Sequence, residues 1–370
     1  MKDGWEYKII GSLCDIKTGK LDANAASPNG KYPFFTCSRE TLKIDNYAYD
    51  CECVLVAGNG ELNAKYYKGK FNAYQRTYII SLKPNTNEIS TKYLYCFFSK
   101  YIETLRQRSI GGVIKYIKLG DLTNAQIPVP DYSRQLIIVE ELDLLSSIIE
   151  KKKAQLNELD NLAQSLFYEM FGDPITNEKG WEVKPLGKEC TELKYGTSKP
   201  ACENGKYKYL RMGNLTINGE LDLSSLKTID IPDDEVEKCV VRYGDILFNR
   251  TNSLDLIGKT CMFNLDEPMV IAGYIIRVRL SLNLNPRYIS AMFNMPRMKL
   301  LLKKMAKGAV NQANINSKEL ASILTPIPPL DLQQQFASKI EAIEHQKELI
   351  KQSIKEVETL FNSRMDYYFN

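Results

Sequence analysis

Apolar side chains recur along residues 131–170 at alternating spacings of three and four. The series comprises Leu142, Leu145, Ile149, Leu156, Leu159, Ala163, Leu166 and Met170, and Lys152 takes the place of one missing member. Such a heptad seam predicts a long helix that packs along another helix. At about 1.5 Å per residue this helix spans roughly 55–60 Å, which is too long for the core of one small domain. The helix therefore needs a partner.

A second seam near the other end of the chain supplies that partner. Its apolar members are Phe336, Ile340, Ile343, Ile350, Ile354, Val357 and Phe361. Lys347 occupies one seam position, where a lysine either sets the pairing register or extends its amino group out to water, and the pattern favours neither. Asp131 and Asp331 follow proline-rich segments and are predicted N-caps, while Gly172 is predicted to end the first helix.

Each long helix follows a block of sequence, and the two blocks begin and end with similar motifs. Both blocks begin with Trp-Glu-x-Lys-x-(Ile/Leu)-Gly, at Trp5 and at Trp181. They close on Ile-Pro-Val-Pro-Asp and Ile-Pro-Pro-Leu-Asp, from Ile127 and from Ile327, and a glutamine follows each. These glutamines are Gln135 and Gln335. The chain is therefore an internal duplication of block and helix.

Each block mixes short β-rich runs with one later helical run. The strand candidates are residues 53–57, 76–82, 245–248 and 274–280, and the helical runs are residues 91–107 and 286–304. The predicted fold class is α+β, with two similar α/β domains joined by two long antiparallel coiled-coil helices in an approximate two-fold arrangement. Parallel helices would require the short link near residue 175 to lead back along the whole helix. The predicted boundaries are 1–130, 131–171, 172–330 and 331–370.

The charge distribution separates the blocks from the helices. The two blocks carry net charges of +6 and +4, whereas the two helical segments carry −4 and −2. The blocks, and not the helices, are therefore expected to meet a polyanion. Apolar content of 44% is ordinary, and neither a run of about 18 apolar residues nor a signal-peptide core occurs, so we expect a cytoplasmic protein without membrane contact.

Cysteine and histidine usage argue against a catalytic or metal centre. Only Cys51 and Cys53 are close together among nine cysteines, so we expect free thiols. His345 is the only histidine and lies on the second long helix, so no metal site is expected. The sequence has neither an Asn-Pro-Pro-Tyr methylation motif nor a Gly-x-x-x-x-Gly-Lys-Ser/Thr phosphate loop, which argues against an enzyme in its own right. A coiled-coil scaffold with no DNA role stays open.

Several motifs together carry a family resemblance. They are QSLFYEMFGDP at 164–174, followed by Asn177 and Gly180-Trp181, with KYPFFT at 31–36, KYYKGKFNA at 65–73 and GDILF at 244–248. In this order, and with the paired Ile-Pro closings, they resemble a type I restriction–modification specificity subunit. The resemblance covers essentially the whole chain.

The resemblance implies a non-catalytic DNA-binding subunit. Each block would be a target-recognition domain for one half of a bipartite, asymmetric site in double-stranded DNA. The helices would set the unread gap and dock DNA-methyltransferase subunits, expected to be two, and motor–nuclease subunits would complete an adenine-specific methyltransferase and ATP-dependent endonuclease. S-adenosylmethionine, ATP and Mg²⁺ would lie on those partners, with no cofactor on this chain. The candidate docking residues are Leu142, Leu145, Ile149, Leu156, Leu159, Ile340, Ile343, Ile350, Ile354 and Val357.

The candidate DNA-contacting residues combine cations for phosphates with amides and a guanidinium for base edges. In the first block they are Asn59, Lys68, Lys70, Asn72, Tyr74, Gln75, Arg76 and Lys115. In the second block they are Arg211, Asn249, Arg250, Thr251, Asn252, Asn311, Gln312 and Asn314. The stretch 249–252 is predicted to be the counterpart of 65–76, and the loops 108–115 and 307–314 are predicted to match. A solvated hairpin and ordinary polar turns are the alternatives for these segments.

Overall fold

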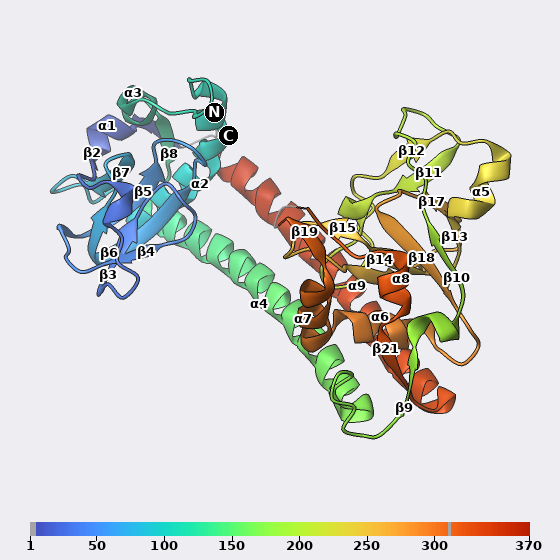
Figure 1. The fold of residues 1–370 in the computed structure, drawn as a ribbon. Helices are drawn as coiled ribbons and strands as arrows, with labels where there is room; N and C mark the ends of the chain where they lie inside the picture. Colours follow the sequence, from blue (N-terminus) through green and yellow to red (C-terminus); the bar gives the residue numbers. More distant parts are fainter. Residues whose placement is uncertain (1–4, 310–311) are drawn as a thin grey trace. The chain divides into compact units, whose positions relative to one another are not determined.

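The computed structural model describes residues 5–309 and 312–370 of the chain (Figure 1). The chain forms two compact units. Unit 1 comprises Met1–Lys153 and Gln352–Asn370, and unit 2 comprises Ala154–Lys351. Each unit therefore contains one block and a segment of both long helices. The four predicted domain boundaries are not tested by this division and stay a prediction.

Unit 1 is built on one six-stranded sheet covered on one face by a helix. The strand order is β2 (Cys14–Thr18), β7 (Thr77–Leu82), β5 (Tyr49–Ala57), β6 (Ala64–Ala73), β3 (Tyr32–Phe35) and β4 (Leu42–Ile44). Along β5 the side chains alternate, so Val54 and Val56 join the core under helix α2 (Thr91–Arg108), while Cys53 and Leu55 fill a second cluster on the other face. Smaller elements complete the unit: β1 (Glu6–Ile9), α1 (Ile10–Leu13), η1 (Ala23–Ala25), α3 (Leu119–Thr123) and β8 (Gln126–Val129).

Unit 2 repeats this order, but two of its strands are broken. One sheet runs β10 (Cys190–Tyr195), β18 (Ile275–Leu280), β14 (Ile246–Asn249) and β16 (Thr260–Met262). The other runs β12 (Lys227–Ile229), β11 (Tyr207–Leu210), β17 (Met269–Ile271) and β13 (Val240–Val241). Strands β13 and β14 together take the place of β5, and β16 and β17 take the place of β6. A turn at Gly244, which has φ +88°, separates β13 from β14.

The remaining elements of unit 2 flank these sheets. They are β9 (Glu182–Pro185), η2 (Leu186–Glu189), η3 (Met212–Asn214), α5 (Asp233–Cys239), β15 (Thr251–Asn252), α6 (Pro286–Asn294), α7 (Pro296–Met305), β19 (Lys307–Ala309), β20 (Gln312–Asn314), α8 (Ser317–Ala321) and β21 (Leu324–Ile327). The helix expected over 286–304 is therefore two helices. Pro296 explains the break, because its ring removes a helical donor and holds Met295 in an extended conformation, with ψ 141°.

The two long helices are α4 (Tyr132–Phe171) and α9 (Leu330–Phe369), and they run antiparallel as predicted. In unit 1 the Glu141 carboxylate meets Arg364 and the Tyr368 hydroxyl. In unit 2 the rings of Phe167 and Phe171 pack on Phe336. The buried positions of α4 in unit 2 are thus one residue beyond the expected Leu166 and Met170, because a helix of 3.6 residues per turn drifts relative to a strict heptad.

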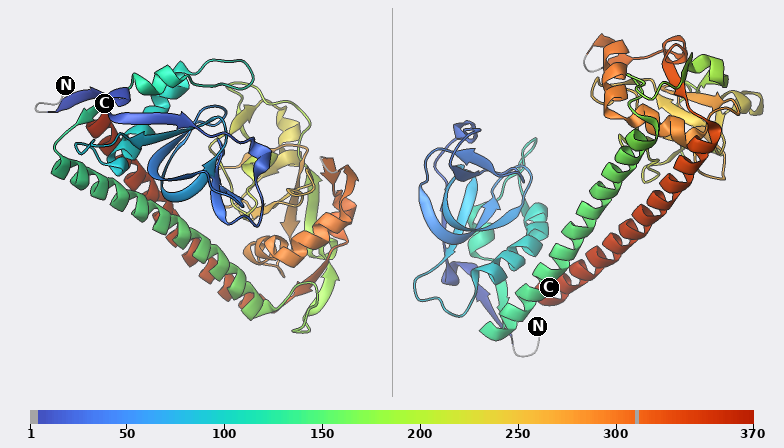
Figure 2. Two further views of the ribbon diagram at one scale, coloured as in Figure 1. Left: turned by 90° about the vertical axis from the view of Figure 1, so that its left-hand side faces the viewer. Right: turned by 90° about the horizontal axis from the view of Figure 1, so that it is seen from below.

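Two of the three residues predicted to begin or end the long helices do so. Asp131 caps α4, because its carboxylate accepts the Arg134 N–H at 2.8 Å. The helix ends at Gly172, which has φ +75°. The expectation for Asp331 is wrong, because α9 begins one residue earlier and Asp331 lies in its first turn. In unit 1 the strand β1 and the C-terminal end of α9 lie side by side (Figures 1 and 2).

A buried glutamine fastens each block to the start of its own helix. Gln135 donates to the carbonyls of Glu88 (2.7 Å) and Pro130 (2.9 Å), and accepts the N–H of Ser90 (3.0 Å). Ser90 in turn caps α2. The contacts therefore tie the first turn of α4 to the segment that begins α2.

Gln333 makes the same three contacts in unit 2. It donates to the carbonyls of Asn283 (3.1 Å) and Pro328 (2.8 Å), and accepts the N–H of Asn285, the residue that caps α6. The sequence comparison had paired Gln135 with Gln335, two residues further on. That pairing is wrong, because Gln335 is exposed and Gln333 is fully buried. Duplication of the fold is confirmed, and all nine cysteines are free, as predicted.

Replacing Gln333 should weaken unit 2 measurably. Gln333→Ala leaves three buried backbone groups without their partner, so we expect the free energy of unfolding to fall by about 1–3 kcal/mol. Gln335→Ala is the matched control and should change it by less than about 0.5 kcal/mol. Chemical denaturation of both variants, followed by circular dichroism, measures the difference. Equal effects of the two substitutions would contradict the assigned register.

Candidate nucleic-acid interface

Three segments distant in sequence meet beside the end of β14 in unit 2. The N–H of Arg250 donates to the carbonyl of Tyr274 at 2.9 Å, and the carbonyl of Arg250 accepts the N–H of Ile315 at 2.9 Å. Directly after Arg250, strand β15 pairs with β20, and β20 pairs with β19. This backbone ladder brings the turn after β14, the loop before β18 and the hairpin of β19 and β20 into one surface.

The side chain of Arg250 is oriented by an aromatic ring. Its guanidinium lies over the ring of Tyr195, 4.9 Å from the centroid. The hydroxyl of Tyr195 donates to the Ser317 hydroxyl at 2.9 Å and accepts the Ser317 N–H at 2.8 Å, which holds the ring. Within the described part of the chain, Nε of Arg250 is buried and has no hydrogen-bond partner. A planar cation stacked in this way is preorganised for a bidentate acceptor.

Amide side chains flank this arginine. The Thr251 hydroxyl donates to Oδ1 of Asn314 at 3.1 Å, and Gln312 is exposed on the same hairpin. A hollow of about 430 Å³ lies over these groups and is lined by Arg250, Thr251, Tyr274, Lys307, Gly308, Gln312 and Asn314. The structure thus brings together four of the candidate residues, Arg250, Thr251, Gln312 and Asn314.

Of three other candidates in unit 2, the structure contradicts Asn249, while Asn252 and Arg211 stay predictions. Asn249 is fully buried and donates to the carbonyls of Thr251 and Tyr274, so it positions the turn and cannot reach a base. Asn252 donates to the Asn249 side chain at 2.9 Å and extends that support. Arg211 lies on the loop after β11, where it donates to the carbonyl of Ser225. Asn311 lies outside the described residues.

Unit 1 carries the same ladder with other residues. The N–H of Gly58 donates to the carbonyl of Arg76 at 2.8 Å, and the carbonyl of Gly58 accepts the N–H of Ile117 at 3.0 Å. Gly58 therefore occupies the place of Arg250, and Asn59, which bridges to Tyr116, occupies the place of Thr251. The predicted counterpart of 249–252 was the stretch 65–76; this is wrong, because the equivalent segment is the turn that ends β5.

The late loops match, as predicted. In unit 1 Ile110 and Tyr116 exchange backbone hydrogen bonds of 3.0 and 2.9 Å, and the N–H of Gly60 donates to the carbonyl of Lys115 at 3.0 Å. This loop corresponds to the β19–β20 hairpin of unit 2. The structure thus brings together the turn at Asn59, the neighbouring Lys115 and the loop that carries Tyr74, Gln75 and Arg76, of which Gln75 and Arg76 are exposed.

The remaining candidates of unit 1 lie apart from this surface. Lys68 and Lys70 pair across β6 with Glu52 and Asp50 of β5, roughly 20 Å along the strand from the turn at Asn59. Lys68 forms an ion pair with Glu52 at 3.0 Å. Asn72 is buried and its amide donates to the carbonyl of Asn46, so the expectation that it reaches a base is wrong.

Sequence reasoning missed Tyr195, Tyr274 and Lys307 as members of the unit 2 surface. Tyr195 ends β10, and its only local signal is an aromatic residue directly before Gly196. That glycine is required, because a Cβ there would lie 2.0 Å from the carbonyl oxygen of Ile271. Lys307 forms an ion pair with Glu319 at 2.6 Å and remains largely exposed. Only the tertiary pairing of β15 with β20 reveals that these residues share one face with Arg250.

The comparison with protein families decides what this duplicated fold is. The model of the type I restriction modification DNA specificity domain matches residues 2–161 and again residues 178–359. The chain belongs to this family. Its two specificity domains coincide with the two copies of the ladder described above.

Relatives of the family show both sequence and fold similarity. The EcoDI specificity subunit of Escherichia coli is 42% identical over 158 residues, which cover 43% of this chain and 35% of that protein. The crystal structure of a type I S subunit from M. genitalium has a TM-score of 0.61 at 15% identity, covering 99% of this chain and 96% of that one. A chain from a study of complex assembly and conformational transition of the type I R-M system has a TM-score of 0.58 at 16% identity, covering 100% and 98%.

The matched segments cover between about a third and just over half of the first curated relatives. At 15–16% identity the solved structures show that the fold is shared. In the described residues no helix has the length and apolar character that crossing a membrane requires.

The predicted docking residues of this specificity-domain protein are largely used within the chain. Leu142, Leu145, Ile149, Ile343 and Ile354 are all at most 9% exposed. The other five are half-buried: Leu156, Leu159, Ile340, Ile350 and Val357. The five buried side chains cannot meet a partner and are wrong as docking residues, whereas docking by the five half-buried ones stays a prediction. The exposed apolar residues of α4 in unit 1 include Ile137 and Leu144, one heptad apart and 52% and 60% exposed.

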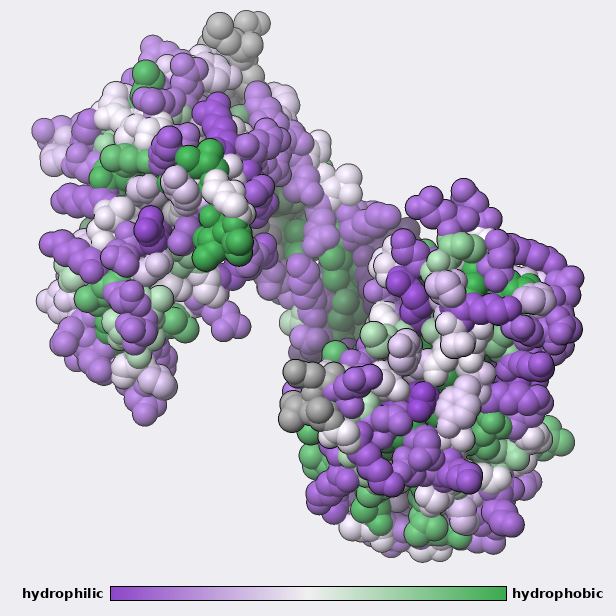
Figure 3. Space-filling view, turned by 45° about the horizontal axis from the view of Figure 1, so that its top comes forward, coloured by the Kyte–Doolittle hydropathy of each residue, from purple (hydrophilic) through white to green (hydrophobic). Residues whose placement is uncertain are grey.

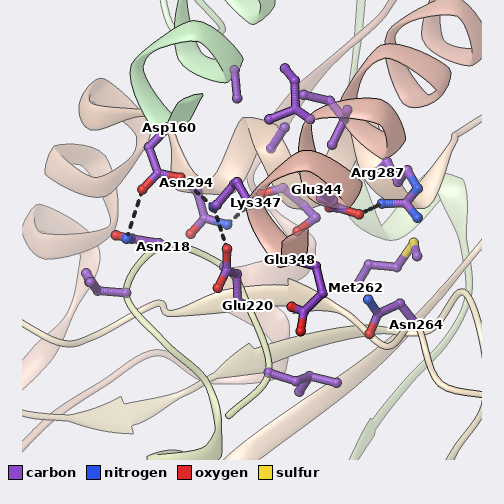
Figure 4. Close-up of a pocket in the computed structure, with 18 of the residues that line it drawn as sticks. Asp160, Asn218, Glu220, Met262, Asn264, Arg287, Asn294, Glu344, Lys347 and Glu348 are labelled. Carbon is purple, nitrogen blue, oxygen red and sulfur yellow. Dashed lines mark hydrogen bonds and ion pairs between the residues drawn. The ribbon is translucent and has the colours of Figure 1, made fainter. Parts of the chain in front are cut away.

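A second hollow lies in unit 2, between its specificity domain and its helical segments (Figure 4). It has a volume of about 480 Å³. The long loop 211–226 reaches it, whereas the equivalent loop of unit 1, residues 36–41, is ten residues shorter. From this loop Glu220 contacts Lys347 and Lys351 of α9, and Asn218 donates to Asp160 of α4.

Lys347 is the centre of this contact. It is 8% exposed and forms ion pairs with both Asp160 and Glu220, so it does not extend to water. Burial lowers the pKa of Lys347, but its hydrogen bonds to the two carboxylates raise the pKa above its usual 10.5. Burial raises the pKa of Glu220, and its contacts with Lys347 and Lys351 lower the pKa below 4.5. The cluster braces the second specificity domain on both helices.

Removing the Lys347 charge should destabilise unit 2 in a pH-dependent way. Lys347→Met leaves Asp160 and Glu220 close together, and we expect a loss of about 1–3 kcal/mol in unfolding free energy at pH 7. The depressed pKa of Glu220 means that this stabilisation is present above pH 4.5 and is lost as pH falls through the lower folded pKa. Because the pKa of Lys347 is raised, the stabilisation remains fully present up to pH 10.5.

Denaturation of native protein and variant at a series of pH values tests this. The difference in unfolding free energy between the native protein and the variant should decrease below pH 4.5. Lys351→Met is the matched control with a smaller effect, because Lys351 is more exposed and, among the described residues, pairs with Glu220 and not with Asp160. A difference that is constant down to pH 3 would rule out the carboxylates as its source.

Proposed function

We propose that this chain is the DNA specificity subunit of a type I restriction–modification complex, and that each unit recognises one half of a bipartite, asymmetric site. One observation carries the proposal. The same backbone ladder occurs in both units but presents different side chains, with Gly58, Asn59 and Arg76 in unit 1 and Arg250, Thr251 and Tyr274 in unit 2. Equivalent surfaces with different base-reading groups suit two different half-sites.

The chemistry of each surface fits duplex DNA. The Arg250 fork, stacked on Tyr195, suits the two acceptors that guanine presents in the major groove. Gln312 and the amide of Asn314 suit adenine. Lys115 and Arg76 in unit 1 and Lys307 in unit 2 are cations at the margins of these surfaces, where they would contact phosphates.

The long helices would have two roles in this proposal. Antiparallel pairing places each specificity domain at the start of its own helix, so helix length would set the unread gap between half-sites. The exposed apolar face of α4 would dock DNA-methyltransferase subunits, of which we expect two. Those subunits, together with motor–nuclease subunits, would supply the chemistry and hold S-adenosylmethionine, ATP and Mg²⁺, and this chain would be non-catalytic.

Mapping methylated adenines across the genome of the source cell tests the proposal directly. We expect a bipartite motif with a fixed gap. Exchanging residues 181–326 for the equivalent segment of another family member should change one half of the motif only. A simultaneous change of both halves would contradict the assignment of one half-site to each unit. Equal, weak binding of all DNA by the purified complex would favour a scaffold without a DNA role.

Arg250 should contribute sequence discrimination in unit 2. Arg250→Ala should weaken binding to the target duplex by about 5- to 150-fold, because a bidentate base contact is worth about 1–3 kcal/mol. The loss should be confined to one half-site. Fluorescence anisotropy with the complex of this chain and its methyltransferase measures it. Lys339→Ala, an exposed cation on α9, is the charge-matched control. An equal loss on all DNA sequences would identify Arg250 as a phosphate contact.

The exposed face of α4 should hold the methyltransferase. Leu144→Glu places a charge on an exposed apolar position, so we expect the co-purifying methyltransferase to be lost while unit 1 stays folded. Leu300→Glu on α7, where the leucine is 58% exposed, is the control and should leave the complex intact. Affinity purification followed by gel filtration gives the result. Retention of the partner by the Leu144 variant would place docking elsewhere.

A further inference from the structure

Unit 1 carries an apolar loop at the margin of its candidate DNA surface. Val113 is fully exposed, at 103%, and Ile114 is 62% exposed. Ile110 and Tyr116, at the two sides of the same loop, are 43% and 39% exposed. The faces of both units seen in Figure 3 are mainly hydrophilic. Four exposed apolar side chains within seven residues form a patch and are not singly scattered groups.

The loop has a defined shape that presents its tip. Ile110 and Tyr116 close it with two backbone hydrogen bonds. Gly111 has φ +119°, and a Cβ there would lie 2.5 Å from the carbonyl oxygen of Ile114, so the turn requires glycine. The next residue, Gly112, has open space around it. The tip therefore projects Val113 and Ile114 away from the unit with no side chain packed beside Gly112.

The root of the loop belongs to the backbone ladder of unit 1. Gly60 donates to the carbonyl of Lys115, and Ile117 donates to the carbonyl of Gly58. The Tyr78 hydroxyl also donates to the carbonyl of Ile117, at 3.3 Å. The tip is thus rigidly joined to the turn that carries Asn59. Lys115, directly after Ile114, is exposed, as is Lys118 just beyond the loop.

We propose that Val113 and Ile114 form a wedge that inserts between stacked base pairs at the half-site of unit 1. This rests on the proposed function, because it takes DNA as the ligand of the ladder surface. Apolar side chains at loop tips flanked by cations are suited to this role, since the cations hold the adjacent phosphates while the apolar groups replace stacking. In the described part of the matching hairpin of unit 2, Lys307 and Gln312 are polar.

The energetics make base unstacking a better readout than affinity. The free energy gained by burying two aliphatic side chains is of the same order as the cost of unstacking one base step. The two nearly cancel, so losing the wedge changes affinity modestly and abolishes the deformation. The balance also favours a flexible pyrimidine–purine step at the insertion point.

The test uses the complex of this chain with its partner subunits and target duplexes that contain 2-aminopurine. The base analogue is placed at successive positions of the half-site that does not respond to Arg250→Ala, excluding the methylated adenine. We expect a several-fold rise in fluorescence at one step on binding. In the Val113→Ser, Ile114→Ser double variant the rise should disappear, while the Kd increases by no more than about tenfold.

Two matched variants separate the wedge from general effects. Val113→Leu with Ile114→Leu keeps an apolar tip and should keep the fluorescence rise. Leu282→Ser removes an apolar side chain that is 94% exposed in unit 2 and should change neither fluorescence nor affinity. Circular dichroism of each variant confirms that the fold is retained.

Three outcomes would overturn the proposal. Sequence-specific binding by the native complex without unstacking in this half-site rules out the wedge and leaves the proposed function intact. Loss of a partner subunit from the double serine variant, with DNA unstacking unchanged, assigns the tip to a protein contact. Absence of sequence-specific binding by the native complex overturns both the wedge and the proposed function.

Discussion

The structure depends on how each sheet is joined to the helix that follows it. In both units one buried glutamine satisfies two carbonyls and one N–H at the junction. A buried tyrosine adds a further hydrogen bond: Tyr93 donates to the carbonyl of Pro128, and Tyr288 donates to the carbonyl of Pro326. An unsatisfied backbone group at such a junction would be costly, so the orientation of sheet on helix has little freedom. This rigidity fixes the side chains that each sheet displays relative to the helix segments of its own unit.

The two units share this junction and differ in how their specificity domains are supported. Unit 2 adds the loop 211–226, whose Glu220 meets Lys347 and Lys351 of α9. The equivalent loop of unit 1 is short, and β5 and β6 remain unbroken. The second domain thus has a less continuous sheet than the first, and ion pairs attach it to its helices. Burial opposes the charged forms, but the contacts outweigh it, so the raised pKa of Lys347 and the lowered pKa of Glu220 both have the direction of a stabilising contact.

Much of this architecture could be predicted from periodicity and repetition. The seams, the doubled Trp-Glu-x-Lys opening and the antiparallel pairing depend on local spacing and chain connectivity, which a sequence displays directly. The alignment of the two repeats was harder to predict, because both Gln333 and Gln335 are plausible equivalents of Gln135 until their burial is known. The candidate site was predicted in part: Arg250 and Asn314 are 64 residues apart and meet only through strand pairing. Asn72 and Asn249 looked like base-reading amides, but backbone carbonyls occupy them.

The ladder itself has a consequence for how such a protein diversifies. Its hydrogen bonds use main-chain groups only, so the fold at this edge is indifferent to most side chains that it displays. Asn59 and Thr251, or Arg76 and Tyr274, occupy equivalent places with unrelated chemistry. Gly58 is less free to vary, because a Cβ there would lie 2.4 Å from the carbonyl oxygen of Arg76. Single substitutions at these positions can therefore change the chemistry of the surface without removing a main-chain hydrogen bond.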